Sequence, residues 1–390
     1  MNLKANIYKL YIIKTAKWFM LIMPIITLFY QENGLSMKDV LLLQGIYSVA
    51  IVALEIPSGY FADLWGRKST LIIGSFLGVI GFGIYSFTYG FWGFLLAELT
   101  LGIGQSFISG SDSALLYDSL KESNREHEYT KIEGRVLSIG NFAETIAAVI
   151  GGFLAEYSLR TPFIAQTFIA MIAIPASISL VEPYRKIIKE DRWKSILRVL
   201  KNTLINNKEL QSLIILTAFI GTATLTMAWF IQPYLKDIQN LSLSEIGITL
   251  SILNLIVGLT TLIAYKIESK LGKTKSLLFI IIGISGSYFL MGTYSHWSIF
   301  LIIAFFYFTR GIATPILKDY INRCTSSDVR ATVLSIRNFA IRVIFAIAGP
   351  FFGWYSDLFS IQSALIIAGI VILTGSIISL FFYLKVSFKK

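Results

Sequence analysis

The stretch VLSIGNFA at residues 136–143 returns 197 residues later as VLSIRNFA at residues 333–340. Seven of the eight positions are identical, and both copies open a long apolar run. Two unrelated apolar helices would not be expected to share serine, asparagine and phenylalanine in one register. Because the offset is about half of the 390-residue chain, the repeat predicts two related halves with the same internal order of helices.

The composition places both halves in a lipid bilayer. Hydrophobic residues make up 55% of the chain and charged residues only 15%, whereas soluble proteins carry about 25% charged residues. A bilayer core about 30 Å thick needs roughly 20 apolar residues per helix. The predicted fold class is therefore an all-α membrane protein of twelve transmembrane helices in two pseudo-symmetric six-helix bundles. The predicted spans are residues 10–31, 40–61, 69–89, 91–117, 133–157, 162–181, 212–235, 244–265, 276–295, 298–318, 331–355 and 360–384.

Basic residues gather on one side of these spans. Of the 34 lysines and arginines, only Lys38, Arg160 and Lys236 fall in loops opposite the termini. Positive charge is enriched in cytoplasmic loops, so both termini are predicted to be cytoplasmic. The same distribution accounts for the net charge of +11 without a nucleic acid partner. We expect a multi-pass monomer in the inner (cytoplasmic) membrane of a bacterium.

The longest loop divides the chain into a first bundle at residues 1–181, a linker at residues 182–211 and a second bundle at residues 212–390. Within the linker, an apolar stripe from Trp193 to Leu204 follows helical spacing and has basic residues on its other face. This pattern predicts either a basic amphipathic helix on the inner membrane surface or a solvated linker helix.

The stretch GYFADLWGRK at residues 59–68 resembles the signature loop of the major facilitator superfamily, G-x-x-x-D-x-x-G-[RK]-[RK]. It lies where that family has it, between the second and third spans, and residues 270–275 form a weaker counterpart in the second half. The resemblance covers essentially the whole chain. It implies a secondary transporter that works by alternating access, with this loop as a conformational gate that does not touch the solute.

The residues of the loop suit such a gate. Gly59 allows a neighbouring helix to approach closely, and Gly66 permits a tight turn. Asp63 is a fixed negative charge that suits a helix N-terminus or an arginine. Arg67 and Lys68 are expected to anchor the turn at the lipid phosphates. Two further charged residues are assigned to the gate: Glu55 and Arg337.

Two positions depart from the pattern of proton antiporters in the family. Many members carry an arginine four residues before a glycine in the fourth span, whereas this chain has Glu98 before Gly102. The G-P-x-x-G-G of the fifth span is AAVIGG at residues 147–152, and a Gly-Pro pair occurs instead at residues 349–350. These departures weaken an assignment to drug–proton antiport.

Ionisable side chains inside the spans mark the candidate site, because a charged residue at the centre of a bilayer costs about 2.5–3.5 kcal/mol. A carboxyl in a low-dielectric cavity can load and release protons near neutral pH, so Glu144 and Asp112 are the predicted proton-coupling residues. Arginine keeps its proton and suits an anion or a carboxylate partner. The alternative is that these charges pair across the halves and hold one state closed. The predicted substrate-binding residues are Arg310, Arg342, Glu98 and Lys17.

Helical geometry adds two expectations about the basic residues. Arg337 and Arg342 are five residues apart and point about 140° from each other on a helix, so at most one is expected to face any given site. Lys14 lies early in the first span and is expected to snorkel to the inner interface.

The leading predicted function is a secondary active transporter that exports a small organic solute, a drug or metabolite, in exchange for protons. Uptake of an anionic nutrient is the alternative, because three arginines lie within spans, and a non-transporting receptor is a third possibility. An enzyme is not expected: with one cysteine, and with His127 and His296 in loops on opposite sides, no metal site or nucleophile–base set is visible. No cofactor is implied, since no G-x-x-x-x-G-K-[ST] nucleotide loop occurs.

Overall fold

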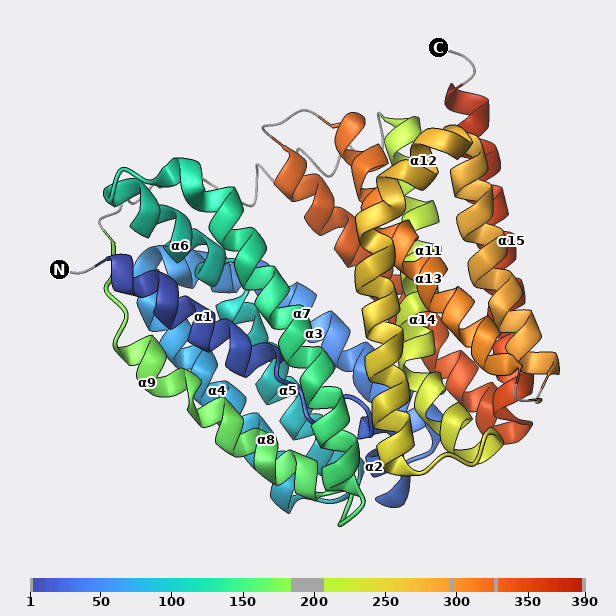
Figure 1. Cartoon of the computed structure of the whole chain (residues 1–390), viewed down its shortest axis with the longest axis horizontal. Coiled ribbons are helices and arrows are strands. Elements are labelled where there is room, and N and C mark those ends of the chain that lie inside the picture. Colours follow the sequence, from blue (N-terminus) through green and yellow to red (C-terminus); the bar gives the residue numbers. More distant parts are fainter. Residues whose placement is uncertain (1–2, 184–206, 295, 297, 326–328, 388–390) are drawn as a thin grey trace. The chain divides into compact units, whose positions relative to one another are not determined.

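The computed structural model describes residues 3–183, 207–294, 296, 298–325 and 329–387, and within these ranges it contains helices and no strands (Figure 1). By length and composition, ten helical segments of the described chain can cross a membrane. The predicted count of twelve spans and the cytoplasmic placement of the termini stay predictions. The predicted amphipathic linker helix, Trp193 to Leu204, lies outside the described residues.

The helices follow one another along the chain with short connections. In the first half they are α1 (Lys4–Trp18), α2 (Ile26–Glu32), α3 (Met37–Trp65), α4 (Arg67–Phe87), α5 (Gly90–Ile108), α6 (Ser111–Glu122), the short 3₁₀ turn η1 (Glu126–Glu128), α7 (Tyr129–Ala155), α8 (Thr161–Met171) and α9 (Ala173–Ile178). In the second half they are α11 (Lys208–Pro233), the π-helical turn η3 (Tyr234–Ile238), α12 (Leu243–Thr293), α13 (Ile299–Arg323), α14 (Arg330–Leu358) and α15 (Ile361–Ser387).

The chain forms two compact units. The first is drawn from Met1–Leu35, Ile46–Lys189 and Leu241–Ser251, and the second from Ser36–Gly45, Glu190–Asn240 and Ile252–Lys390. Each unit therefore consists mainly of one predicted half plus a short segment of the other. The predicted domain boundaries at 181–182 and 211–212 stay predictions.

In the first unit, α4 packs along α5 and α8, and α1 packs along α7. Small residues permit the close approach of α4 and α5: a methyl group built on Gly74 would lie 2.9 Å from the carbonyl oxygen of Gly104. The first predicted span is interrupted between Trp18 and Ile26. Pro24 accounts for this break, because it lacks an N–H and disfavours helical geometry at the preceding residue.

In the second unit, α11 packs against α13, α14 and α15. The 51-residue helix α12 contains two of the predicted spans and bends at Gly272, where φ is +73°. Gly66 takes a φ of +103° at the equivalent turn of the first half. The weaker sequence repeat thus corresponds to two turns that each use one glycine in the left-handed region.

An acid from a distant part of the chain caps one helix start in each unit. In the first unit, the Glu156 carboxylate accepts the backbone N–H of Ser244 at 2.8 Å. In the second, Asp357 accepts the N–H groups of Met37 at 2.9 Å and Lys38 at 2.8 Å. These acids end α7 and α14, the two helices that carry the sequence repeat, so the repeated scaffold extends to the far ends of both helices.

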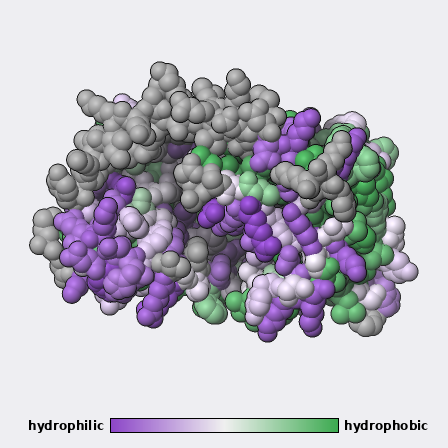
Figure 2. Space-filling view, turned by 90° about the horizontal axis from the view of Figure 1, so that it is seen from above, coloured by the Kyte–Doolittle hydropathy of each residue, from purple (hydrophilic) through white to green (hydrophobic). Residues whose placement is uncertain are grey.

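The surface matches the composition. Large apolar side chains such as Trp92, Leu301 and Ile347 are exposed, as expected where lipid rather than water is the neighbour. Hydrophilic residues gather on the face shown in Figure 2, which is the view from above Figure 1.

Candidate functional site

A cavity of about 320 Å³ lies inside the first unit, among α1, α3, α4, α5, α7, α8 and α9. Most of its lining is apolar, and glycines of α4 and α5 leave room for it. Glu144 from α7 and Lys17 from α1 are the charged lining residues, and Gln105 adds an amide. The structure therefore brings together one predicted proton-coupling acid and one predicted substrate-binding base.

An ion pair between α1 and α6 lies beside this cavity, and its basic partner is on the same helix as Lys17. The Lys14 ammonium is 2.5 Å from the Asp112 carboxylate, and both side chains are nine-tenths buried. Asp112 occupies the first turn of α6, where a negative charge also favours the helix dipole. The sequence predicted that Lys14 reaches the inner interface, whereas in the structure its ammonium pairs with Asp112 and is largely buried. Asp112 itself does not line the cavity.

Glu98 occupies a different place, within a cluster of aromatic rings that includes Tyr30, Tyr85 and Phe94. The Tyr30 hydroxyl donates to Glu98 Oε1 at 2.7 Å and lies 2.5 Å from the Tyr85 hydroxyl. The rings of Phe94 and Tyr85 stack nearby. Glu98 is buried and does not line the cavity, so its predicted contact with substrate stays a prediction.

Next to this cluster, Arg160 closes the end of α4. Its guanidinium donates to the carbonyl oxygens of Tyr85, Ser86 and Thr88 at 3.0–3.1 Å and lies over the Tyr89 ring. A cation at a helix C-terminus satisfies carbonyls that have no partner within the helix. The sequence placed Arg160 only in a loop opposite the termini, and its role at the end of α4 was not predicted.

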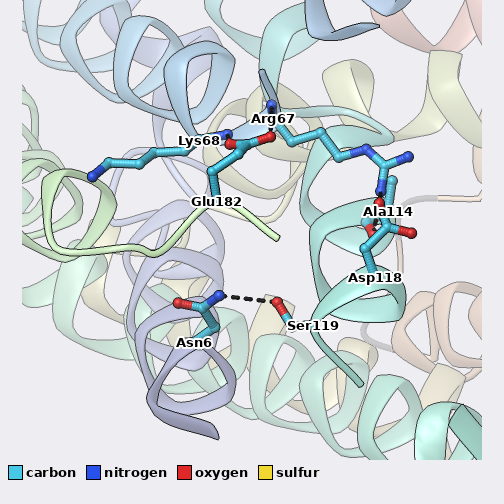
Figure 3. Close-up of polar contacts among 7 residues, drawn as sticks. All are labelled: Asn6, Arg67, Lys68, Ala114, Asp118, Ser119 and Glu182. Carbon is cyan, nitrogen blue, oxygen red and sulfur yellow. Dashed lines mark hydrogen bonds and ion pairs between the residues drawn. The ribbon is translucent and has the colours of Figure 1, made fainter. Parts of the chain in front are cut away.

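The predicted gate forms a polar cluster around the turn between α3 and α4 (Figure 3). Glu182 caps the start of α4: its two carboxylate oxygens accept the N–H groups of Arg67 at 2.9 Å and Lys68 at 2.6 Å. The Arg67 guanidinium donates to the Ala114 carbonyl oxygen at 2.6 Å and forms an ion pair with Asp118 of α6. Arg67 thus makes internal contacts, where the sequence analysis expected lipid phosphates.

A second set of bonds ties the same region together. Asn6 of α1 donates to the Ser119 hydroxyl at 2.9 Å and to the Val181 carbonyl at 2.8 Å, and its own oxygen accepts the Val181 N–H at 3.0 Å. The gate cluster therefore links α1, α4, α6 and the segment after α9. Asp118 and Glu182 were not predicted, since nothing local in the sequence indicates a partner 51 or 115 residues away.

Three other predicted gate residues lie on α3, which stays helical up to Trp65. Gly59 and Asp63 are in its last two turns, one turn apart, and the side chain of Asp63 is outside the description. Glu55 is exposed, and its carbonyl oxygen accepts the Ser58 hydroxyl at 3.0 Å. The gating role of these residues stays a prediction.

A second cavity, of about 300 Å³, lies inside the second unit among α11, α13 and α14. Its polar lining comprises Arg337, Asn338, Arg342 and the threonines at positions 217, 224 and 314. The expectation that at most one of the two arginines faces any given site is wrong. Long flexible side chains can turn along the helix surface, so an angle of about 140° between Cα–Cβ directions does not separate their guanidinium groups.

Arg310 does not line this cavity, although it lies on α13 one turn before Thr314. Its guanidinium lies 5.5 Å from the centre of the Tyr307 ring, a geometry that allows a cation–π contact. The predicted substrate contact of Arg310 stays a prediction. Among the residues that the structure describes, no group of three or more histidine, cysteine or acidic side chains could hold a metal ion.

Comparison with known proteins gives one consistent result. The sequence model of the Major Facilitator Superfamily matches residues 11–223 and 214–390. An uncharacterised MFS-type transporter of Methanocaldococcus jannaschii is 24% identical over 272 residues, 69% of each chain. The quinolone resistance protein NorA of Staphylococcus aureus is 24% identical over 231 residues, 59% of this chain and 58% of NorA.

Solved structures share the fold. The nucleoside transporter NupG superposes with a TM-score of 0.81 at 13% identity, over 98% of this chain and 99% of that chain. A bacterial homologue of the human lysosomal transporter Spinster gives a TM-score of 0.79 at 16% identity, over 98% and 96% of the two chains. These relatives are transporters rather than enzymes. With a family model that covers both halves, the chain belongs to the major facilitator superfamily of multi-pass membrane transporters.

Proposed function

We propose that this chain is a proton-coupled secondary transporter that exports a small organic solute from the bacterial cytoplasm by alternating access. The observation that carries the proposal is Glu144, an acid on the wall of a largely apolar cavity in the first unit. Ionisable carboxyl groups inside membrane helices that face a cavity are characteristic of proton pathways in transporters. The similarity to the quinolone resistance protein NorA favours export as the direction.

We assign a second role to the ion pair beside the cavity. Lys14 stabilises the charged form of Asp112, so Asp112 takes up a proton only after the pair separates, and that separation releases Lys14. Lys17 lies one helical turn after Lys14 and lines the cavity, so a change at the pair alters the positive potential at the cavity wall. We assign Glu144 to proton exchange with the solute and Asp112 to the control of the lysine pair.

Transport by the purified full-length protein in proteoliposomes with an imposed pH gradient tests the proposal. A panel of cationic, neutral and anionic solutes identifies one that is transported. Glu144→Gln is expected to abolish flux driven by the gradient and to keep solute exchange without a gradient. The matched control is Glu126→Gln, which removes an exposed acid in η1 and is expected to leave driven flux intact. Unchanged driven flux in Glu144→Gln would refute the coupling role.

Uptake of an anionic nutrient is the second candidate, favoured by the two arginines in the cavity of the second unit. The direction of the gradient distinguishes the two: export by exchange is accelerated by an acidic compartment on the side to which the solute moves, and proton-coupled uptake by an acidic compartment on the side that it leaves. Solute binding without flux under either gradient would favour a receptor over a transporter.

A further inference from the structure

The cavity of the second unit has a charge composition unlike that of the first. Two arginines, Arg337 and Arg342, are among its lining residues, and none of its lining residues is acidic. The cavity of the first unit instead combines Lys17 with Glu144. Basic residues without an acid along one small membrane-embedded space favour an anionic ligand there.

The hydrogen bonds of Arg337 point to the same kind of ligand. Its Nη1 donates to the amide oxygen of Asn338 at 3.2 Å, while Nε is buried and has no hydrogen-bond partner. Nε and Nη2 form one edge of the guanidinium with two parallel N–H groups, and Nε is closed to solvent here, so the side chain has to turn for this edge to face a ligand in the cavity. This edge matches the two oxygens of a carboxylate or phosphate group. A buried N–H without a partner is costly, so an acceptor there stabilises the site.

The threonines of the cavity are already engaged as donors. The Thr217 hydroxyl donates to the Leu213 carbonyl at 2.7 Å, and the Thr224 hydroxyl donates to Gly221 at 2.8 Å. Their oxygens remain acceptors toward the cavity. The positive charge that would hold an anion therefore comes from the arginines and not from the hydroxyls.

The repeat shows that the scaffold itself does not require a charge here. Gly140 of α7 occupies the position of Arg337 in the first half. There a methyl group built on the glycine would lie 3.1 Å from the indole Cγ of Trp18, so an aromatic ring covers the site. Since one copy of the helix places glycine under tryptophan and the other places arginine in a cavity, Arg337 is not needed to form the helix.

We propose that the Arg337–Arg342 cavity is an anion subsite and that the transported solute carries a carboxylate or phosphate group that docks on it. The naming of the ligand as the transported solute rests on the proposed transport function. The anion site itself does not, because it can be measured at equilibrium without a gradient.

Thermal unfolding of the full-length protein in neutral phosphatidylcholine bilayers tests the site. The probes share one phenyl ring: benzoate, phenyl phosphate, benzamide and benzylammonium. Benzoate and phenyl phosphate are expected to raise the unfolding midpoint saturably, and benzamide and benzylammonium are not. Arg337→Gln and Arg342→Gln are each expected to weaken benzoate binding by about tenfold or more. Arg337→Lys, which keeps the charge and loses the two-pronged edge, is expected to fall between Arg337→Gln and the wild type.

Matched variants keep the result decisive. Arg323→Gln removes an exposed arginine that pairs with Asp319 on the surface of the same unit and is expected to bind benzoate as the wild type does. If Arg337→Gln does not fold, Arg337→Ala replaces it, because alanine has the highest helix propensity and buries no polar group. Wild-type benzoate affinity in folded Arg337 and Arg342 variants would overturn the proposal, as would equal stabilisation by benzamide.

A lipid phosphate has the same chemistry as a phosphorylated solute, so a further arm separates the two. Phosphatidylglycerol is added to the bilayer in place of part of the phosphatidylcholine. If this lipid raises the midpoint of the wild type but not of Arg337→Gln, and benzoate then adds nothing, the cavity holds a lipid headgroup and the solute assignment is wrong. If benzoate stabilises equally in both bilayers, the solute assignment stands. Failure of gradient-driven transport leaves these outcomes unchanged and counts only against the proposed function.

Discussion

Replacing Glu182 tests how the gate turn is held. The carboxylate accepts two backbone N–H groups at the first turn of α4, at 2.9 and 2.6 Å. Loss of a capping side chain costs about 0.5–2 kcal/mol, and loss of a negative charge at a helix N-terminus about 0.3–1 kcal/mol. We therefore expect a loss of about 1 kcal/mol for Glu182→Gln, which keeps one acceptor oxygen, and about 2 kcal/mol for Glu182→Ala.

The assay is thermal unfolding of the detergent-purified full-length protein followed by tryptophan fluorescence at a fixed scan rate. A loss of 1 kcal/mol lowers the midpoint by about 2–4 °C in a folded unit of roughly 200 residues, so the alanine variant should lie about twice as far below the wild type as the glutamine variant. Glu126→Ala, which removes an exposed acid in η1, is the control and should shift the midpoint little.

The partners of Glu182 are main-chain groups, so capping can be distinguished from pairing with basic side chains by a second experiment. The penalty of Glu182→Ala should persist when Arg67 and Lys68 are both replaced by glutamine, because their N–H groups remain. If the penalty vanishes in that background, Glu182 acts by pairing with the basic side chains and the capping explanation is wrong. A midpoint for Glu182→Ala equal to that of Glu126→Ala would refute it as well.

Three further predictions concern the first unit. Gly151→Ala should lower the unfolding midpoint by several degrees, because its methyl group would meet the Leu21 carbonyl oxygen at 1.9 Å, whereas Gly83→Ala, with nothing within 4 Å, should not. Arg160→Gln should lose about 2 kcal/mol as three carbonyl groups lose a charged donor, and an unchanged midpoint would contradict this. Glu98→Gln should be tolerated within about 1 kcal/mol, since the amide oxygen still accepts the Tyr30 hydroxyl, but Glu98→Leu should cost about 1–3 kcal/mol; equal midpoints for these two variants would show that this bond contributes nothing.

The sequence predicted those parts of the fold that local pattern encodes. Apolar runs marked the helices, and the two loop glycines marked the turns at Gly66 and Gly272. Pro24 indicated the interruption of the first span, but the span was predicted from the length of its apolar run alone. A hydropathy reading averages over such a residue and does not separate a break from a tolerated proline. Three other prolines in apolar runs lie inside helices that continue through them: Pro57, Pro315 and Pro350.

The candidate site was predicted less completely, because its partners are distant in sequence. Lys14 and Asp112 are 98 residues apart, and their pairing depends on how α1 packs against α6. Arg337 and Arg342 share one cavity because their side chains are long, which the angle between their Cα–Cβ directions does not capture. Residue type singled out Glu144 and Lys17, since few charges lie inside apolar helices without a polar space to face. Both line one cavity, and their predicted roles in proton coupling and substrate binding stay predictions.

The single-residue turn at Gly66 has a mechanical consequence. Helix α3 ends at Trp65 and α4 begins at Arg67, so Gly66 is the only residue between the two helices. Successive Cα atoms are about 3.8 Å apart, so this connection cannot lengthen by more than a few ångströms. A larger displacement of the end of α3 therefore has to move α4 as well. At that end α4 is hydrogen-bonded to Glu182 and, through Arg67, paired with α6. The turn therefore couples the motion of the two helices, and an insertion of flexible residues there would allow them to move independently.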